Sequence, residues 1–221
     1  QNNSVVSTLI YFRNGKVNRC IVKNNSHSYN LVDLRSSSVS NSLFCNNTCA
    51  NEYVIFNLES QSSLINCTAV GNQTKSGNVV SLNNSTLRNS IIVGNTTAKG
   101  YSSCLGTSGT NTIVNNMLES TFVVGNIDGS MKYAAFTDPE NGDYSLSENS
   151  YCINAGSDVA DLYDMFGKER KQGGAVDMGA IESAYTKSVE SATCGEIVYV
   201  KFGSEGDGTS WKSAFGDIQE A

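Results

Sequence analysis

Five basic side chains of the N-terminal half are the first residues whose type and spacing could support chemistry: Arg13, Lys16, Arg19, Lys23 and Arg88. Four of them fall within one short stretch. Such side chains could abstract a proton or bind an acidic ligand. The alternative is that they are scattered charges that keep a β-rich surface soluble. Because no acidic cluster accompanies them, we treat them as ligand-contact candidates and assign no catalytic residue.

Three aspartates, Asp158, Asp161 and Asp164, form the densest carboxylate group. Hard cations such as Ca²⁺ prefer several such oxygens, but a spacing of three residues is not that of an EF-hand. We favour the alternative that these aspartates cap turns and pair with Arg170. No Cys/His spacing suits a transition metal. We therefore expect no metal and no cofactor, with Ca²⁺ at these aspartates as the weak exception.

The sole histidine, His27, lies between two repeats. We expect a solvated loop residue, although a Cys–His nucleophile could form only through it. The chain has seven cysteines, an odd number, so at least one is unpaired within the chain. We interpret most of them as small, buried core residues.

A nine-residue phrase organises the chain. Its copies start at Val17, Val39, Leu64 and Leu87, and a degraded copy starts at Ile113, at spacings of 22, 25, 23 and 26 residues. A second apolar phrase recurs in step with it, at residues 9–12, 31–34, 55–58 and 79–82. Two phrases that share one period indicate a single supersecondary unit stacked on copies of itself.

The apolar residues of both phrases form short β-branched runs bounded by Asn, Ser and Gly, which is typical of strands and turns. A leucine-rich repeat would need a Leu frame that is missing. The sequence therefore predicts an all-β fold, a right-handed parallel β-helix of about four to five coils stacked about 4.8 Å apart. The strands expected outside the nine-residue phrase are 5–12, 31–34, 53–58 and 79–82, all parallel between coils.

The last position of the phrase is always asparagine: Asn25, Asn47, Asn72 and Asn95. Stacked coils would place these residues in one column, where each amide can donate to one neighbour and accept from another. Asparagine also tolerates the left-handed backbone of a sharp bend. We predict a buried hydrogen-bonded ladder rather than a row of glycan acceptors.

The net charge of −6 hides an asymmetry. Residues 1–100 carry eight Lys/Arg and three Asp/Glu, whereas residues 101–221 carry seven and eighteen. The acidic half argues against a nucleic-acid partner. No apolar run is long enough to span a membrane. The chain begins within a strand pattern, without a signal peptide, so we expect a mature or excised fragment.

Five motifs follow the repeats in order: Phe136/Asp138, Gly142 to Leu146, Ser150/Ile153/Gly156, Asp164/Gly167/Arg170 and Val176 to Glu182. This block resembles the closing region of secreted bacterial β-helix surface proteins of the pectin-lyase-like superfamily, of the choice-of-anchor Q type. The resemblance implies a secreted or cell-surface, bacterial location. It also implies that Asp164, Arg170, Asp177 and Glu182 are structural, as turn-forming and ion-paired residues.

The resemblance divides the chain into a parallel β-helix at 1–183, with an irregular closing region at 119–183, a linker at 184–196, and a strand plus short C-terminal helix at 197–221. The last segment resembles an opening cap of the same kind of β-helix. We expect it to dock on an open N-terminal coil of its own or a neighbouring chain, which would give a head-to-tail self-contact.

Three functions stay open at this point. The first is a non-catalytic extracellular module for adhesion or glycan contact, with a polysaccharide or a host or cell-surface glycan as partner. The second is a polysaccharide lyase or glycoside hydrolase that acts on an acidic polysaccharide. The third is a structural spacer. The absence of paired carboxylates or a His in the coils favours the non-enzymes. Fold alone does not imply an activity.

Overall fold

The computed structural model describes residues 4–5, 7–97, 103–119 and 123–186. The chain divides into two compact units, Gln1–Ser188 and Val189–Ala221. All described residues belong to the first unit. The predicted cap and C-terminal helix at 197–221, most of the linker, and the head-to-tail contact lie outside the described residues.

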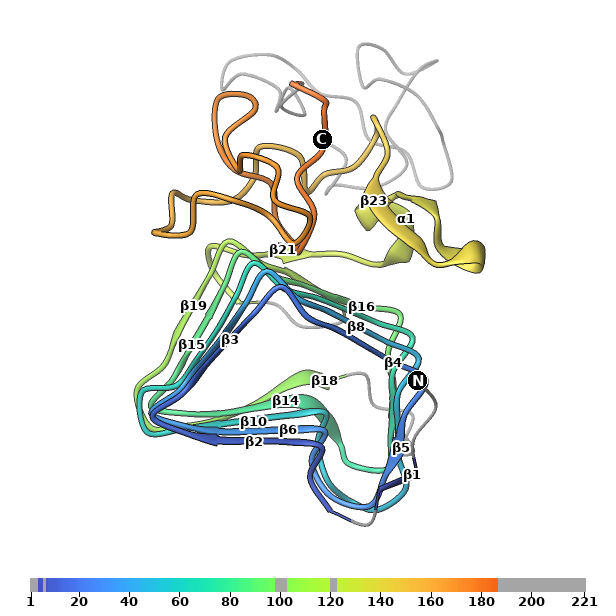
Figure 1. Cartoon of the computed structure of the whole chain (residues 1–221), viewed down its shortest axis with the longest axis vertical. Coiled ribbons are helices and arrows are strands. Elements are labelled where there is room, and N and C mark those ends of the chain that lie inside the picture. Colours follow the sequence, from blue (N-terminus) through green and yellow to red (C-terminus); the bar gives the residue numbers. More distant parts are fainter. Residues whose placement is uncertain (1–3, 6, 98–102, 120–122, 187–221) are drawn as a thin grey trace. The chain divides into compact units, whose positions relative to one another are not determined.

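The first unit is a parallel β-solenoid of about four turns, in which each turn contributes one strand to each of four sheets (Figure 1). Sheet A contains β1 (Ser4–Val5), β5 (Ser26–His27), β9 (Thr48–Cys49), β13 (Gln73–Thr74) and β17 (Thr96–Thr97). Sheet B contains β2 (Ile10–Arg13), β6 (Val32–Arg35), β10 (Phe56–Glu59), β14 (Asn78–Asn83) and β18 (Ser103–Ser108). Sheet C contains β3 (Lys16–Asn18), β7 (Ser38–Ser40), β11 (Ser63–Ile65), β15 (Thr86–Arg88) and β19 (Thr112–Val114). Sheet D contains β4 (Ile21–Lys23), β8 (Leu43–Cys45), β12 (Thr68–Val70), β16 (Ile91–Val93), β20 (Met117–Leu118) and β21 (Ile127–Asp128).

The strands pair in parallel and in register, as the repeat predicts. In sheet B, Leu58 pairs with Leu34 on one side and with Leu82 on the other. In sheet C, Leu64 pairs likewise with Val39 and Leu87. The second phrase forms sheet B and the nine-residue phrase forms sheets C and D. The equal positions of successive repeats therefore become straight columns of side chains.

The core lies inside the coils. It is built from the inward positions of sheets B, C and D, and residues such as Leu34, Phe56, Leu64 and Ile92 are almost wholly buried there. Burying a side chain of this kind contributes about 1.5–3 kcal/mol. Cys49, Cys67 and Cys104 fill the same core.

Many bends after sheets B, C and D use the same device. A residue with positive φ turns the chain, and the next residue has a side-chain oxygen that accepts the backbone N–H of the equivalent residue one coil earlier. Gly15, Cys20 and Cys67 occupy this second position without a side-chain oxygen. After sheet C, for example, Asn41 has a φ of 48° and Ser42 Oγ accepts from the Cys20 N–H at 3.0 Å. The side chain is needed because a bent backbone cannot continue the strand ladder.

The asparagine ladder is confirmed, with one correction. Asn25 donates from Nδ2 to Asn47 Oδ1 at 3.0 Å, Asn47 to Asn72 at 2.9 Å, and Asn72 to Asn95 at 2.9 Å. The left-handed bend was assigned to these residues but lies one position earlier, for example at Gly71 with a φ of 65°. The ladder residues are the second member of the bend device, which satisfies backbone donors.

After β21, the closing region contains a short helix that the sequence did not predict, α1 (Met131–Ala134). It continues with an antiparallel hairpin of β22 (Phe136–Asp138) and β23 (Asp143–Leu146), joined by a 3₁₀ turn at Pro139–Asn141. This region packs beside sheet D (Figure 1). Outward residues of sheet D such as Val70 and Ile91 share a second buried cluster with Phe136, Met165 and other closing residues.

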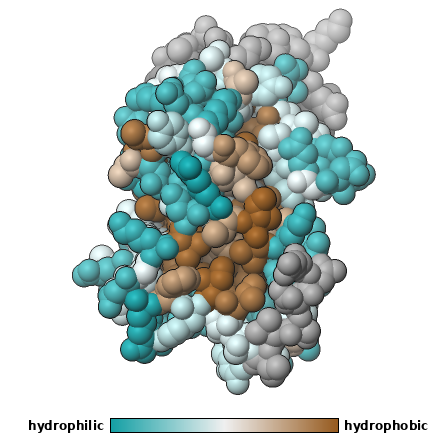
Figure 2. All heavy atoms as spheres, viewed as in Figure 1, coloured by the Kyte–Doolittle hydropathy of each residue, from teal (hydrophilic) through white to brown (hydrophobic). Residues whose placement is uncertain are grey.

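The first coil ends the stack with partly open core positions. Figure 2 shows a continuous apolar area on this end of the solenoid. Phe12 is 38% exposed and Val22 is only partly buried, whereas their neighbours one coil on, Leu34 and Phe44, are buried. Among the residues that the structure describes, no helix is long and apolar enough to cross a membrane.

Candidate functional site

The outer face of sheet B carries two columns of polar side chains across five coils. The first column contains Tyr11, Asp33, Asn57 and Ser81, with Gly106 at its end. The second contains Arg13, Arg35, Glu59, Asn83 and Ser108. None of the side chains described in these columns is buried, because the closing region covers sheet D instead. Sheet B therefore offers a long polar surface.

The centre of this face is a network of four side chains, Asp33, Arg35, Asn57 and Glu59, and a fifth side chain, Asn30, contacts it. Asn57 Nδ2 donates to Asp33 Oδ2 at 3.3 Å and to Glu59 Oε1 at 3.2 Å. Arg35 Nη2 lies 3.3 Å from Glu59 Oε2, and its Nε lies 3.9 Å from Asp33 Oδ1. Asn30 donates to Asp33 Oδ2 at 3.1 Å. One amide and one guanidinium thus hold two carboxylates together.

This network corrects an expectation from the sequence, which indicated no paired carboxylates in the coils. Because both carboxylates bond the same Asn57 nitrogen, the two oxygens lie no more than about 6.5 Å apart, which does not exceed the separation of carboxyl pairs that flank a glycosidic bond. Asp33 and Glu59 are far apart in sequence, and only the coil register brings them together. Alignment of the second phrases places Tyr11, Asp33 and Asn57 at one position, and this alignment could have predicted that the polar residues of sheet B lie together.

An exposed aromatic residue ends the first column. Tyr11 is 50% exposed, and Arg13 Nε donates to its hydroxyl at 2.6 Å. The Arg13 guanidinium also lies over the Tyr11 ring, 5.8 Å from its centre. This contact holds the ring in place while half of the residue's surface stays available to a ligand.

The five predicted basic residues do not form one site. Arg13 lies on sheet B, Lys16 on sheet C and Lys23 on sheet D. Arg19 occupies a left-handed bend, with its guanidinium over the Tyr163 ring at 5.7 Å. Arg88 binds the closing region, from Nε to Ser157 Oγ at 2.9 Å and from Nη2 to the Asp158 carbonyl at 2.7 Å. The first four of these residues lie in one coil, but on different faces of the solenoid.

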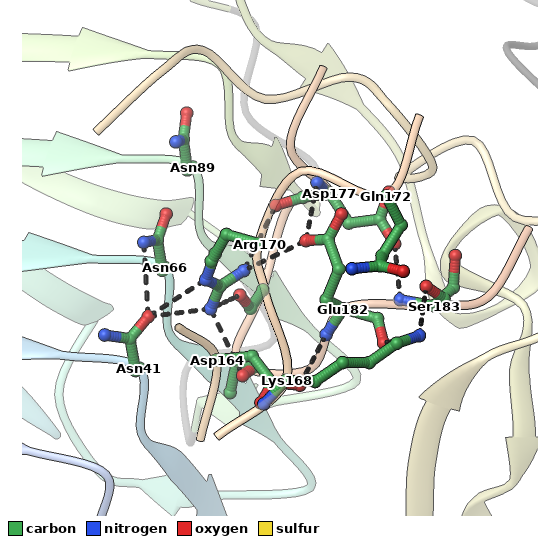
Figure 3. Close-up of polar contacts among 12 residues, drawn as sticks. Asn41, Asn66, Asn89, Asp164, Lys168, Arg170, Gln172, Asp177, Glu182 and Ser183 are labelled. Atoms are coloured by element: carbon green, nitrogen blue, oxygen red, sulfur yellow. Dashed lines mark hydrogen bonds and ion pairs between the residues drawn. The ribbon is translucent and has the colours of Figure 1, made fainter. Parts of the chain in front are cut away.

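The closing-motif residues form a buried charged cluster against the coils (Figure 3). Arg170 is 2% exposed and donates to Asn41 Oδ1 from Nη2 at 2.8 Å and from Nε at 3.1 Å. It also donates to the Gly179 carbonyl at 2.9 Å, and its Nη1 lies 3.6 Å from Glu182 Oε2. Arg170 therefore ties the closing region to a bend of the second coil.

The three acidic members of the cluster accept backbone N–H groups. Asp164 accepts from Phe166, Lys168 and Glu182 at 2.8–3.0 Å. Asp177 accepts from Asn154 and Ser183, both at 2.7 Å, and Glu182 Oε2 accepts from Asp177 at 3.1 Å.

Burial dominates the ionisation of this cluster. Burial and the Asp177 carboxylate raise the pKa of Glu182 to about 8, against the pull of Arg170. Burial lowers the pKa of Arg170, although Glu182 and Asp164 oppose the shift. One guanidinium faces three carboxylates here, so the region favours a protonated Glu182.

The weak calcium candidates contact three different partners. Asp158 pairs with Lys171 at 3.1 Å, Asp161 accepts from Asn41 Nδ2 at 3.0 Å, and Asp164 caps its own turn. In the described part of the chain, no three His, Cys, Asp or Glu side chains form a group that could hold a metal ion.

His27 differs from its predicted state. It is 1% exposed on the inner side of sheet A, next to Cys49, rather than solvated in a loop. Burial lowers its pKa, and its Nδ1 contacts the Tyr29 carbonyl. His27 is therefore a core residue, and its neutral ring donates a hydrogen bond to this carbonyl. The strand of sheet A that contains His27, β5, is only two residues long, so no alternation of residues in the sequence indicates that His27 is buried.

Comparison with known proteins finds no matching family model and no matching curated protein.

Proposed function

We propose that this protein is an extracellular or cell-surface module that contacts glycan through the outer face of sheet B, without catalysis. The observation that carries the proposal is the uncovered pair of polar columns, with Tyr11 at one end. Sugars present many hydroxyl groups that both donate and accept, and they also present apolar C–H faces. Carboxylate, amide and guanidinium groups match the hydroxyls, and an exposed tyrosine ring matches the C–H face.

Unused hydrogen-bonding groups support this assignment. Arg35 Nε and Asp33 Oδ1 face each other across 3.9 Å, too far for a hydrogen bond, and neither has another partner among the described residues. A small movement of the Arg35 side chain, which is 43% exposed, would admit one hydroxyl that satisfies both atoms. The five closing motifs support the extracellular location.

A glycan array tests the proposal directly. The full chain should bind a subset of the printed glycans, and the Asn57→Ala variant should lose at least about tenfold in affinity, the effect of one good polar contact of about 1.4 kcal/mol. Thr96→Ala, an exposed change on sheet A, is the matched control and should bind as the unchanged chain does. If no glycan binds, the module is a spacer rather than a glycan contact.

A glycoside hydrolase is the second candidate, because Asp33 and Glu59 supply the paired carboxylates that such an enzyme needs. The lyase has less support, since the basic candidates lie on separate faces. We would incubate each bound glycan with the protein and measure new reducing ends. The hydrolase predicts release that Glu59→Gln abolishes while binding persists. Binding without release favours the non-catalytic module.

A further inference from the structure

A shallow polar cavity, largely open to solvent, lies at the bend between sheets B and C, across the first three coils. Its volume is about 330 Å³, at the lower end of the range of small-ligand sites. Lys16, Ser38 and Ser63 line it from successive strands of sheet C, and Asn14, Ser36 and Gln61 line it from the bends. It therefore lies outside the network of the sheet B face.

Several donors that line the cavity have no partner among the described residues. Within this part of the chain, the Lys16 ammonium forms no ion pair, and the hydroxyls of Ser38 and Ser63 and the amide of Gln61 form no hydrogen bond. Ser36 and Ser37 differ, since their hydroxyls donate to the carbonyls of Ser60 and Arg35. No carboxylate lines the cavity. A cation with surrounding neutral donors is suited to an anionic group.

The cavity adjoins the sheet B face through the chain itself. Arg13 and Arg35 end their strands, and the bend residues Asn14 and Ser36 follow each of them directly. Glu59, the nearest acid of the face by sequence, is paired with Arg35 at 3.3 Å. A glycan that lies on sheet B can therefore place a substituent around this bend.

We propose that this bend cavity holds the anionic substituent, a carboxylate or a sulfate, of the glycan that lies on sheet B. The inference rests on the proposed glycan contact and names its ligand class as an acidic glycan. Lys16 supplies the charge, and Ser38, Ser63 and Gln61 donate hydrogen bonds to the anion oxygens. A lysine ammonium is a point charge on a flexible stem, so it accepts either anion without the planar geometry that arginine demands.

Matched glycan pairs test the inference. Each pair on the array is a charged oligomer and its neutral counterpart: oligogalacturonate with its carboxyl-reduced form, and sulfated dextran with its parent. The full chain should bind a charged member at least about tenfold more tightly than its counterpart, and the arm that binds identifies the anion. Lys16→Gln should lose that preference while its affinity for the neutral member stays unchanged.

The control is Lys23→Gln, which removes the same charge from the same coil on sheet D, away from the cavity. It corrects for long-range attraction and should keep the preference. Equal binding of charged and neutral members, or equal losses in the two lysine variants, would overturn the anion site while the glycan contact stands. Failure to bind any glycan on the full array would instead overturn the proposed function.

Discussion

Sheets B and D share one architecture but differ in what covers them. Both stack parallel strands in register, and both present alternate residues to the same core. Sheet D also buries its outer residues, such as Val70 and Ile91, beneath the closing region, whereas sheet B presents Asp33 and Asn57 to solvent. The polarity of the outward-facing residues therefore indicates which sheet of the solenoid is covered.

The strand patterns express this difference. The sheet D strand Ile91–Val93 is an unbroken apolar run, typical of a strand buried on both faces, while the sheet B strand Val32–Arg35 alternates. The first-coil strand of sheet D, Ile21–Lys23, alternates in burial as well, and Ile21 is exposed. The closing region thus covers the later coils and leaves the first coil open.

The largest expected effect is on the free energy of unfolding, when a charge is introduced on the outer face of sheet D and compared with one on sheet B. Ile91→Asp places a carboxylate beneath Gly179, where a buried charge without a partner should cost about 3–5 kcal/mol of unfolding free energy. Ser81→Asp, an outward change in the same coil, should stay within about 0.5 kcal/mol. Chemical denaturation of both variants measures the contrast. Similar losses would mean that sheet B is covered too.

The asparagine ladder should give the next largest effect. Asn72→Ala removes an acceptor for the Asn47 amide and backbone, and a donor to the Phe44 carbonyl, all buried. We expect a loss of roughly 1–3 kcal/mol, the cost of leaving such groups unpaired. Asn83→Ala, on the exposed face of sheet B, is the control. A change of a few tenths of a kcal/mol for Asn72→Ala would show that the column is solvated.

Stability should also depend on pH through Glu182. Its pKa is about 8 in the folded chain and near its ordinary 4.5 when unfolded, so the folded state binds the extra proton between these values. The unfolding free energy should therefore fall as pH rises from about 5 to 8 and stay lower above that. Glu182→Gln should remove this fall and be more stable than the unchanged chain at pH 9, by on the order of 1–3 kcal/mol.

The control for that experiment is Glu59→Gln on sheet B, a partly exposed carboxylate whose loss should change stability by less than about 1 kcal/mol at either pH. Denaturation of each variant at pH 5 and pH 9 gives the comparison. A Glu182→Gln variant that is weaker than the unchanged chain at pH 9 would show that the ion pair with Arg170 outweighs burial.

The sequence predicted the repeats better than the site. Parallel coils, most strand positions and the asparagine column follow from local periodicity, which Leu64 and Leu87 carry plainly. The single strand predicted at 5–12 is wrong, because this segment forms β1 and β2 in two different sheets. The carboxylate pair of Asp33 and Glu59 does not, because it depends on a register between coils rather than on spacing within one. Burial of His27 and the contact of Arg170 with Asn41 depend on tertiary packing that no local pattern expresses.

The location of glycan contact is the central claim, and footprinting of exposed aromatic side chains tests it most directly. Tyr11 is 50% exposed on sheet B, Tyr53 is 40% exposed, and Phe166 is 70% exposed in the closing region. A glycan that binds on the array is added to the protein in solution, and hydroxyl-radical labelling is measured by mass spectrometry with and without it. Each sample reports the labelling of all three side chains. We expect protection of Tyr11, with Tyr53 and Phe166 unchanged. Protection of Phe166 or Tyr53 without protection of Tyr11 would contradict the account.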